Sequence, residues 1–371
     1  MGAQLSLMPT NSRREARAPR FMLGAHHPSW LRTARVPLFV SRRTLSKLKK
    51  LPRAAAPWGQ DSGGFIELQL HGEWTVSAAQ YVTETRRNVA EIGQMLFAAP
   101  RDWMCEPQVI GGLVERRKAK ACPSCKGAGR RALGKVPTMR TVSLDADERP
   151  LFCCPVCAHE ERGKAPQIKV GTWLQWARGR GRALAQAVAY AERLGVDAVV
   201  VFHGTGLSVE EHQRRTIEDF LELRRLAPEI PWIPVLQGWH VTDYWRHIEM
   251  YLKAGVDLRD EPLVGVGSVC RRQGTTVAEL IFRTLAEYGL RLHGFGVKAT
   301  GLARFAQYLI SADSMAWSDH ARRRPPMIAG HDKPGPGRRK GHKNCANCLE
   351  WALQSYWMLV EKLGFEERRA A

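Results

Sequence analysis

The chain has 371 residues, of which 44% are hydrophobic and 25% charged, a mixture typical of folded globular proteins that excludes a disordered or fibrous chain. Lys and Arg outnumber Asp and Glu by 56 to 36, and the formal net charge of +20 is expected to attract a polyanion, with nucleic acid the leading partner and an anionic membrane surface the alternative. No apolar run reaches the roughly 18 residues that a spanning helix needs, which excludes a membrane-embedded protein.

The chain begins with a basic tail at 1–20, and short apolar runs then recur, each ending in Gly, Asp, His or Gln. Such runs predict buried parallel strands with polar groups at their carboxyl ends. They lie at 21–24, 36–40, 95–102, 232–238, 262–268 and 292–297.

Helical patterns lie between these runs, at about 76–92, 208–227, 242–254, 276–288, 302–310 and 348–363. The clearest helix begins at Ser208, where Glu211 is expected to complete a capping box, and ends before Pro228. The alternation predicts an α/β protein, and it favours a (β/α)8 TIM-like barrel over an open doubly wound sheet. In such a barrel the residues that end the strands carry the chemistry.

The segment after 111 interrupts this rhythm with basic and cysteine-rich stretches, and we interpret it as a zinc-knuckle insertion. The expected organisation is a tail, a first barrel part, the insertion, a second barrel part, and a C-terminal segment with a basic loop, a zinc site and a final helix. These parts span 1–20, 21–111, 112–203, 204–321 and 322–371. An apolar strand at 197–202 can belong to the barrel or to the insertion, so the boundary near 195–206 stays open.

Nine cysteines are too few for a disulfide scaffold, and six of them form C-x-x-C pairs, which favours a reducing, cytoplasmic location and metal binding. Cys122 and Cys125, with Cys154 and Cys157, predict a structural Zn²⁺ site of four thiolates. Cys153 is an alternative to Cys154, and unligated thiols or a redox pair are the alternatives to zinc.

A second metal cluster is predicted near the C-terminus. His342, Cys345 and Cys348 follow one another at intervals of three residues, and His331 is the nearest fourth ligand. A second Zn²⁺ ion is expected there. The alternative is a helix N-terminus whose two cysteines face the core.

Carboxylates, amides and glycines gather where the predicted strands end. The alternative to a functional role is, for each of them, a structural role as a capping or core residue. The groups are Asp61, Ser62 and Gly63 in DSGGF, Asp102 in APRD, Gln237 and Gly238, Gly265 and Gly267, Phe295 and Gly296, and Asp313 in DSMAW.

In this order the strings resemble the tRNA-guanine transglycosylase superfamily, and within it the sequence is most similar to the DNA guanine transglycosylases (deoxypurine-in-DNA protein A). The similarity covers about 21–111 and 204–355 and includes LGAHHPSWL, VPLFVSRRTL, DSGGFIELQLHGEW, APRDWMCEP, LSVEEHQRRT and PVLQGW. Two features depart from the pattern. No His follows Cys348, as the family's zinc site would require, and the insertion after DWMCEP has no place in the core pattern.

The resemblance implies an exchange of guanine in DNA for a 7-deazaguanine such as 7-cyano-7-deazaguanine, with accessory DNA-modification proteins as further partners. Asp313 would attack C1′ and form a covalent intermediate, Asp61 would carry the proton of the base nitrogen, and Asp102 would accept hydrogen bonds from the N–H edge of guanine. The remaining strand-end groups would bind the base, with Phe295 over its face. The target base must leave the helix stack, so a basic groove is expected.

Two other functions remain open on the sequence. One is the same exchange on tRNA, and the other is a catalytically silent, zinc-dependent nucleic-acid-binding protein. The basic runs at 42–50 and 322–340 are candidates for phosphate contacts in each case, or else solvated faces.

Overall fold

The structure is a computed structural model, and it describes residues 20–111, 204–334 apart from 271 and 273, and 340–363. Between 112 and 203 it describes the backbone of short strands alone. The predicted four-cysteine site at Cys122, Cys125, Cys154 and Cys157 lies outside the described residues, so it stays a prediction.

Eight parallel strands form one sheet, in the order β10, β11, β12, β13, β1, β2, β3, β4. The strands are β1 (Arg20–Ala25), β2 (Leu38–Ser41), β3 (Trp58–Asp61), β4 (Met95–Ala98), β10 (Val235–Leu236), β11 (Val264–Val266), β12 (Leu292–Gly294) and β13 (Leu309–Ser314).

The two edges of this sheet meet. Ala98 at the end of β4 forms a parallel bridge with Trp232, just before β10, and its N–H donates to the Pro231 carbonyl at 3.0 Å while its own carbonyl accepts from the Ile233 N–H at 3.2 Å. The sheet therefore curls round on itself, consistent with the predicted TIM-like barrel.

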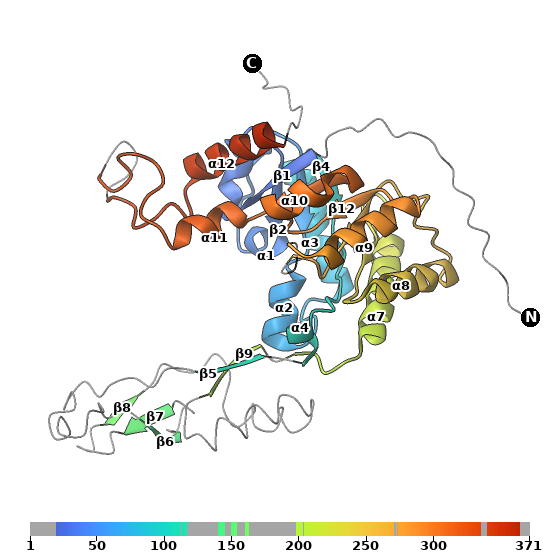
Figure 1. Ribbon diagram of the computed structural model, residues 1–371, viewed down its shortest axis with the longest axis horizontal. Coiled ribbons are helices and arrows are strands. Elements are labelled where there is room, and N and C mark those ends of the chain that lie inside the picture. The colour runs from blue at the N-terminus through green and yellow to red at the C-terminus, as the bar shows by residue number, and fades with distance from the viewer. Residues whose placement is uncertain are drawn as a thin grey trace, which may run out of the picture.

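Helices follow most strands and cover the outside of the sheet (Figure 1). They are α1 (Arg42–Leu45), α2 (Gly64–His71), α3 (Ala78–Ile92), α4 (Pro107–Gly111), α7 (Val209–Leu226), α8 (Val241–Lys253), α9 (Thr276–Glu287), α10 (Ala299–Phe305), α11 (Ala316–Arg322) and α12 (Leu349–Lys362), with the 3-10 turns η1 (Pro28–Arg32) and η3 (Ala306–Tyr308). Within the described residues, no helix has the length and apolar character needed to cross a membrane.

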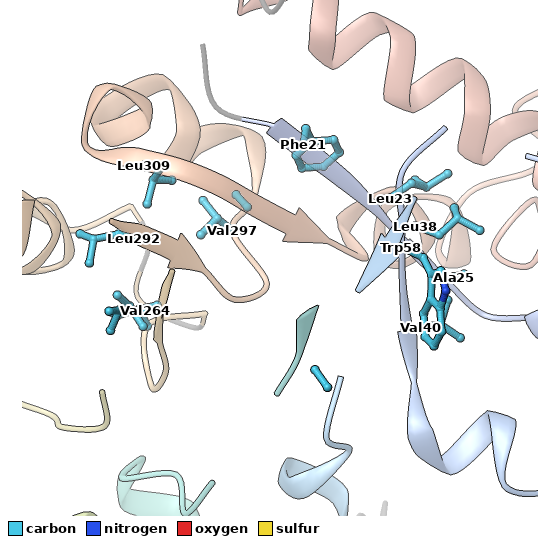
Figure 2. Close-up of a cluster of buried hydrophobic side chains, with 14 of the residues drawn as sticks. Phe21, Leu23, Ala25, Leu38, Val40, Trp58, Val264, Leu292, Val297 and Leu309 are labelled. Carbon is cyan, nitrogen blue, oxygen red and sulfur yellow. The ribbon is translucent and has the colours of Figure 1, made fainter. Parts of the chain in front are cut away.

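Alternation along the strands separates two apolar layers. On β1, Met22 points into the sheet's concave interior with Phe39, Phe97 and Ile233, whereas Phe21 and Leu23 belong to the outer layer under the helices. Figure 2 shows side chains of the outer layer, among them Phe21, Leu38 and Leu292. The interior is thus filled by few large side chains, which leaves the polar groups at the strand ends above them.

Most predicted elements are confirmed, with corrections at their ends. The helix expected over 302–310 ends at Phe305, and Leu309 begins strand β13. Ser208 caps α7 by accepting from the Glu211 N–H at 3.1 Å, but the Glu211 carboxylate accepts from Arg214 and Arg215 instead of completing the capping box.

The strand near 197–202 is not part of the barrel sheet. It is β9 (Ala198–Phe202) and pairs antiparallel with β5 (Leu113–Arg116) in a sheet of its own, beside α2. Three further short strands, β6 (Arg140–Leu144), β7 (Pro150–Cys153) and β8 (Glu160–Arg162), form an antiparallel sheet. Both antiparallel sheets are separate from the eight-stranded parallel sheet, and the insertion stays a prediction.

Candidate active site and metal cluster

The predicted site residues gather at one end of the barrel because all eight strands run parallel and their carboxyl ends share one edge. Asp61 ends β3, Asp102 follows β4, Gln237 follows β10 and Asp313 lies near the end of β13. Hydrogen bonds and electrostatic interactions join these groups, although up to 252 positions separate them in the chain.

Asp61 lies where the chain turns from β3 into α2. Gly63 has φ of +74°, a left-handed conformation that favours glycine, and its N–H donates to Asp61 Oδ2 at 3.1 Å. Burial and the negative charge of Asp313 raise the pKa of Asp61 to about 6, although hydrogen bonds from Ser41 and Gly63 oppose that shift. A carboxyl group with this pKa can both hold and release a proton near neutral pH.

Asp102 is almost completely buried and is held from two sides. Ser62 Oγ donates to its Oδ1 at 2.9 Å, and Gln237 Nε2 donates to its Oδ2 at 2.7 Å. Burial raises the pKa of Asp102 to about 7, against the effect of these two donors. Trp103 fixes the segment that follows β4, because its indole N–H donates to Oδ2 of Asp219, a residue of α7, at 2.9 Å.

Gln237 is fully buried, and its backbone is fixed before its amide reaches Asp102. Its N–H donates to His247 Nδ1 at 2.9 Å, while its carbonyl accepts from Gln213 Nε2 at 2.7 Å. Burial lowers the pKa of His247 to about 3, so the ring is neutral and its Nδ1 can accept. Ser268 Oγ lies 2.6 Å from Gln237 Oε1 on the other side of the amide.

Glycines on β11 and after it make room for two of the predicted base-binding side chains. A Cβ on Gly265 would lie 2.4 Å from the Phe295 ring, and one on Gly267 would lie 2.3 Å from Gln237 Nε2. A Cβ on Gly238 would lie 2.7 Å from Asp243 Cβ on α8. The close approach of these side chains explains the glycines, in addition to the exposed backbone that the sequence suggests.

Phe295 is half-buried and lies on the aromatic rings of the barrel interior. Its ring centroid is 5.9 Å from that of Phe39 and 4.7 Å from that of His293. One part of the ring thus packs in the core, and another part remains accessible at the strand ends.

Asp313 is buried and lies opposite the turn after β12. The Gly296 N–H donates to its Oδ1 at 2.9 Å, and His293 Nε2 lies 3.4 Å from the same oxygen. Ser311 Oγ lies 2.8 Å from His293 Nδ1 and orients the ring from its other side. The sequence analysis missed His293, because a single His inside an apolar strand gives no signal of its partner.

Two other groups of the site, the Glu106 carboxyl group and the Cys105 N–H, escaped the sequence analysis for the same reason. Glu106 Oε2 lies 2.9 Å from Ser268 Oγ, and the Cys105 N–H donates to that hydroxyl oxygen at 2.8 Å. Arg42, expected in a phosphate-binding run, is buried, pairs with Glu84 and donates to the Ser62 carbonyl at 3.4 Å. Its charge is therefore used within the protein.

The predicted C-terminal cluster forms in the structure. The ligand atoms of His331, His342, Cys345 and Cys348 all lie within 4.8 Å of one another, and the cluster is mostly buried. Nδ1 of His331 is 3.7 Å from Cys345 Sγ and 3.6 Å from Cys348 Sγ. Tetrahedral Zn–N and Zn–S bonds imply an N···S separation of about 3.6 Å, so this donor set can bind a metal ion.

His331 is oriented as metal-binding histidines commonly are. Its Nε2 lies 2.9 Å from Glu350 Oε2, which leaves Nδ1 directed at the two cysteines. Glu350 belongs to α12, whose N-cap is Cys348. The cluster therefore ties the start of α12 to the segment before it, and α12 packs against β1 through Tyr356 and Phe21.

The model of the DpdA family, described as DeoxyPurine in DNA protein A, matches residues 18–121 and 196–365. The chain belongs to this family. Among curated proteins, none matches the chain.

The resemblance found in the sequence is thereby confirmed. The DpdA match leaves out 122–195, the interval that holds both predicted cysteine pairs of the insertion. Membership in the DpdA family implies a transglycosylase-like enzyme that acts on purines in DNA.

Proposed function

We propose that this protein exchanges guanine in DNA for a 7-deazaguanine base, such as 7-cyano-7-deazaguanine, through a covalent bond between Asp313 and the DNA. The observation that carries this proposal is the placement of two interacting carboxyl groups, Asp61 and Asp313, at the end of a barrel whose third carboxyl group, Asp102, is held in place by Ser62 and Gln237. Family membership supplies the class of substrate.

In the first step an Asp313 oxygen attacks C1′ of the guanosine unit. The bond between C1′ and the base nitrogen breaks, its electron pair stays with guanine, and Asp61 delivers a proton to the leaving base. The raised pKa of Asp61, due to burial and to Asp313, allows it to hold that proton near neutral pH. In the second step the incoming base gives its nitrogen proton to Asp61, attacks C1′ and releases Asp313.

Base recognition falls to Asp102 and Gln237. As a carboxylate, Asp102 can accept from the adjacent N–H groups of a guanine edge, which 7-deazaguanines share. Ser62, Gly63, Gly238, Gly265, Gly267 and Gly296 shape the surrounding backbone, and the accessible part of Phe295 covers the base. Extruding the base from the duplex costs a few kcal/mol, and the net charge of +20 favours holding the strand meanwhile.

We also propose that the metal of the C-terminal cluster is zinc, bound by His331, His342, Cys345 and Cys348. The mixed nitrogen and thiolate donor set and the N···S distances support zinc. Its contribution is structural, since bound zinc would fix the start of α12.

The Asp313→Asn variant tests the exchange. It should fold and bind DNA, lose base exchange by several orders of magnitude, and fail to form the adduct that wild type gives with guanine-containing DNA on denaturing gels. Asp319→Asn is the matched control, since Asp319 is exposed on α11. Asp61→Asn should slow both steps. If Asp313→Asn forms the adduct and Asp61→Asn does not, the assigned roles are reversed.

Nucleoside mass spectrometry of DNA and tRNA from expressing cells supplied with a deazaguanine tests the substrate. We expect the modified base in DNA. Its presence in tRNA alone would overturn the DNA assignment, and its absence from both would favour a nucleic-acid-binding protein without catalysis.

A further inference from the structure

Ser268 stands at the centre of a buried hydrogen-bond chain behind the base-recognition residues. It follows β11 with φ of +56°, a left-handed conformation that is uncommon for a residue with a side chain. Its hydroxyl oxygen has three neighbours: the Cys105 N–H at 2.8 Å, Gln237 Oε1 at 2.6 Å and Glu106 Oε2 at 2.9 Å. Glu106 is 2% exposed.

The hydroxyl has one proton and two lone pairs, so these three neighbours restrict one another. The Cys105 N–H always donates and occupies one lone pair. Of the two remaining neighbours, one accepts the hydroxyl proton and the other has to donate. If Ser268 donates to Gln237 Oε1, then Glu106 must be a neutral carboxylic acid that donates to Ser268.

If the Gln237 amide is turned the other way round, Asp102 has to be protonated in place of Glu106. The amide N–H would then donate to Ser268, Ser268 would donate to a Glu106 carboxylate, and Gln237 Oε1 would face Asp102 Oδ2. Two facing acceptors repel, so Asp102 would have to be protonated. Either orientation therefore requires one proton on the pair of carboxyl groups.

We propose that Asp102 and Glu106 share one proton through Gln237 and Ser268, and that Glu106 holds it while Asp102 presents a carboxylate to the base. Glu106 is thus a positioning residue, acting on the base through the orientation of the Gln237 amide. In this state the site suits a base that offers N–H groups to Asp102, as guanine does, and disfavours adenine, which offers a lone pair at its ring nitrogen. This last consequence rests on the proposed function, whereas the proton count does not.

Several titratable or charged groups surround the pair on the elements packed against it. Among the described residues they are Asp61, Tyr81, Cys105, Asp243, Tyr244, Arg246, Tyr251 and Arg272. Burial raises the pKa of the Cys105 thiol and of the Tyr244 phenol, so both stay neutral near pH 7. Burial likewise raises the pKa of Asp102 to about 7, which agrees with a proton held within the pair.

The test is Glu106→Gln, which keeps the shape of the protonated acid and supplies a permanent N–H donor to Ser268. With Gln at 106, Gln237 can turn its N–H to Asp102, which then ionises. We expect the infrared spectrum of the free protein at pH 7 to lose one protonated-carboxyl C=O band, whichever carboxyl group carries the proton in the wild type. Glu261→Gln is the matched control, because buried Glu261 pairs with Arg224 at 2.7 Å and should contribute no such band.

The pH profile of base exchange gives a second readout. Wild-type exchange should fall at alkaline pH when the pair loses its proton, and Glu106→Gln should move that fall to higher pH and lower the neutral rate less than Glu106→Ala does. Glu106→Ala, which leaves the second lone pair of the Ser268 hydroxyl without a donor, should lower exchange by roughly tenfold or more. In a Ser268→Ala background, Glu106→Gln should no longer move the profile, since the link is gone.

An unchanged infrared spectrum in Glu106→Gln would overturn the shared proton, even if the enzyme exchanges bases as proposed. A neutral rate reduced as much in Glu106→Gln as in Glu106→Ala would also overturn it, because Glu106 would then act as a carboxylate. The infrared spectrum is recorded on the free protein, without base or DNA, so its outcome does not depend on the proposed reaction.

Discussion

A methyl group at Gly267 should damage base recognition directly. In Gly267→Ala the new Cβ would lie 2.3 Å from Gln237 Nε2 and 2.5 Å from its Oε1. Gln237 is fully buried, and its backbone is held by His247 and Gln213, so its amide has to move. The φ of Gly267 lies outside the left-handed region, and the backbone itself should accept alanine.

The magnitude follows from two effects. Overpacking of a tight interior costs about 1–3 kcal/mol, and loss of the hydrogen bond from Gln237 to the Asp102 carboxylate costs about 1.5–3 kcal/mol. The free energy of unfolding should therefore fall by about 2.5–6 kcal/mol, a large part of the ~5–15 kcal/mol of a typical domain. The hydrogen-bond loss alone corresponds to a roughly 10- to 100-fold lower kcat/KM for base exchange.

Chemical denaturation measures the first quantity, and incorporation of labelled guanine into DNA measures the second. Gly274→Ala is the control, because a Cβ there meets no atom within 4 Å. If Gly267→Ala matched Gly274→Ala in both measurements, Gln237 would not be held as described and its role in base binding would be refuted.

Three further predictions concern pH, zinc and the insertion. Burial raises the pKa of Asp61 to about 6 and of Asp102 to about 7, so the folded state binds these protons more tightly than the unfolded chain does. Denaturant midpoints should therefore fall as pH rises from about 4 to about 7, and Asp102→Asn should flatten this trend. Midpoints that rise over this pH range would contradict the prediction. Cys345→Ser and Cys348→Ser should each remove one equivalent of zinc, measured by elemental analysis, and lower the melting temperature; unchanged zinc content would exclude this cluster as the site. Deleting 113–195 should leave the barrel folded but weaken DNA binding and flatten its salt dependence, and an unchanged salt slope would argue against a phosphate-binding insertion.

The sequence by itself determined the α/β alternation, most helices and the strand-end groups of the site. These features are local: an apolar run, a capping Ser208 or a polar residue after a strand can be read within a few neighbours. Two strands of the parallel sheet escaped, for local reasons as well. β3 reads WGQD, where buried Gln60 is satisfied by Thr85 and Asn88 of α3, and β13 begins inside what looks like a helix.

Only the tertiary structure decided which groups act on one another. Asp102 meets Gln237 across 135 positions, and Cys105 meets Ser268 across 163, so no local pattern can pair them. Closure of the parallel sheet brings these strand ends together, because hydrogen bonding between neighbouring strands fixes their order and register. The fourth ligand of the metal cluster was likewise decided by the tertiary structure. The sequence offers His331 only as the nearest remaining ligand, whereas folding places its Nδ1 3.7 Å from Cys345 Sγ and 3.6 Å from Cys348 Sγ.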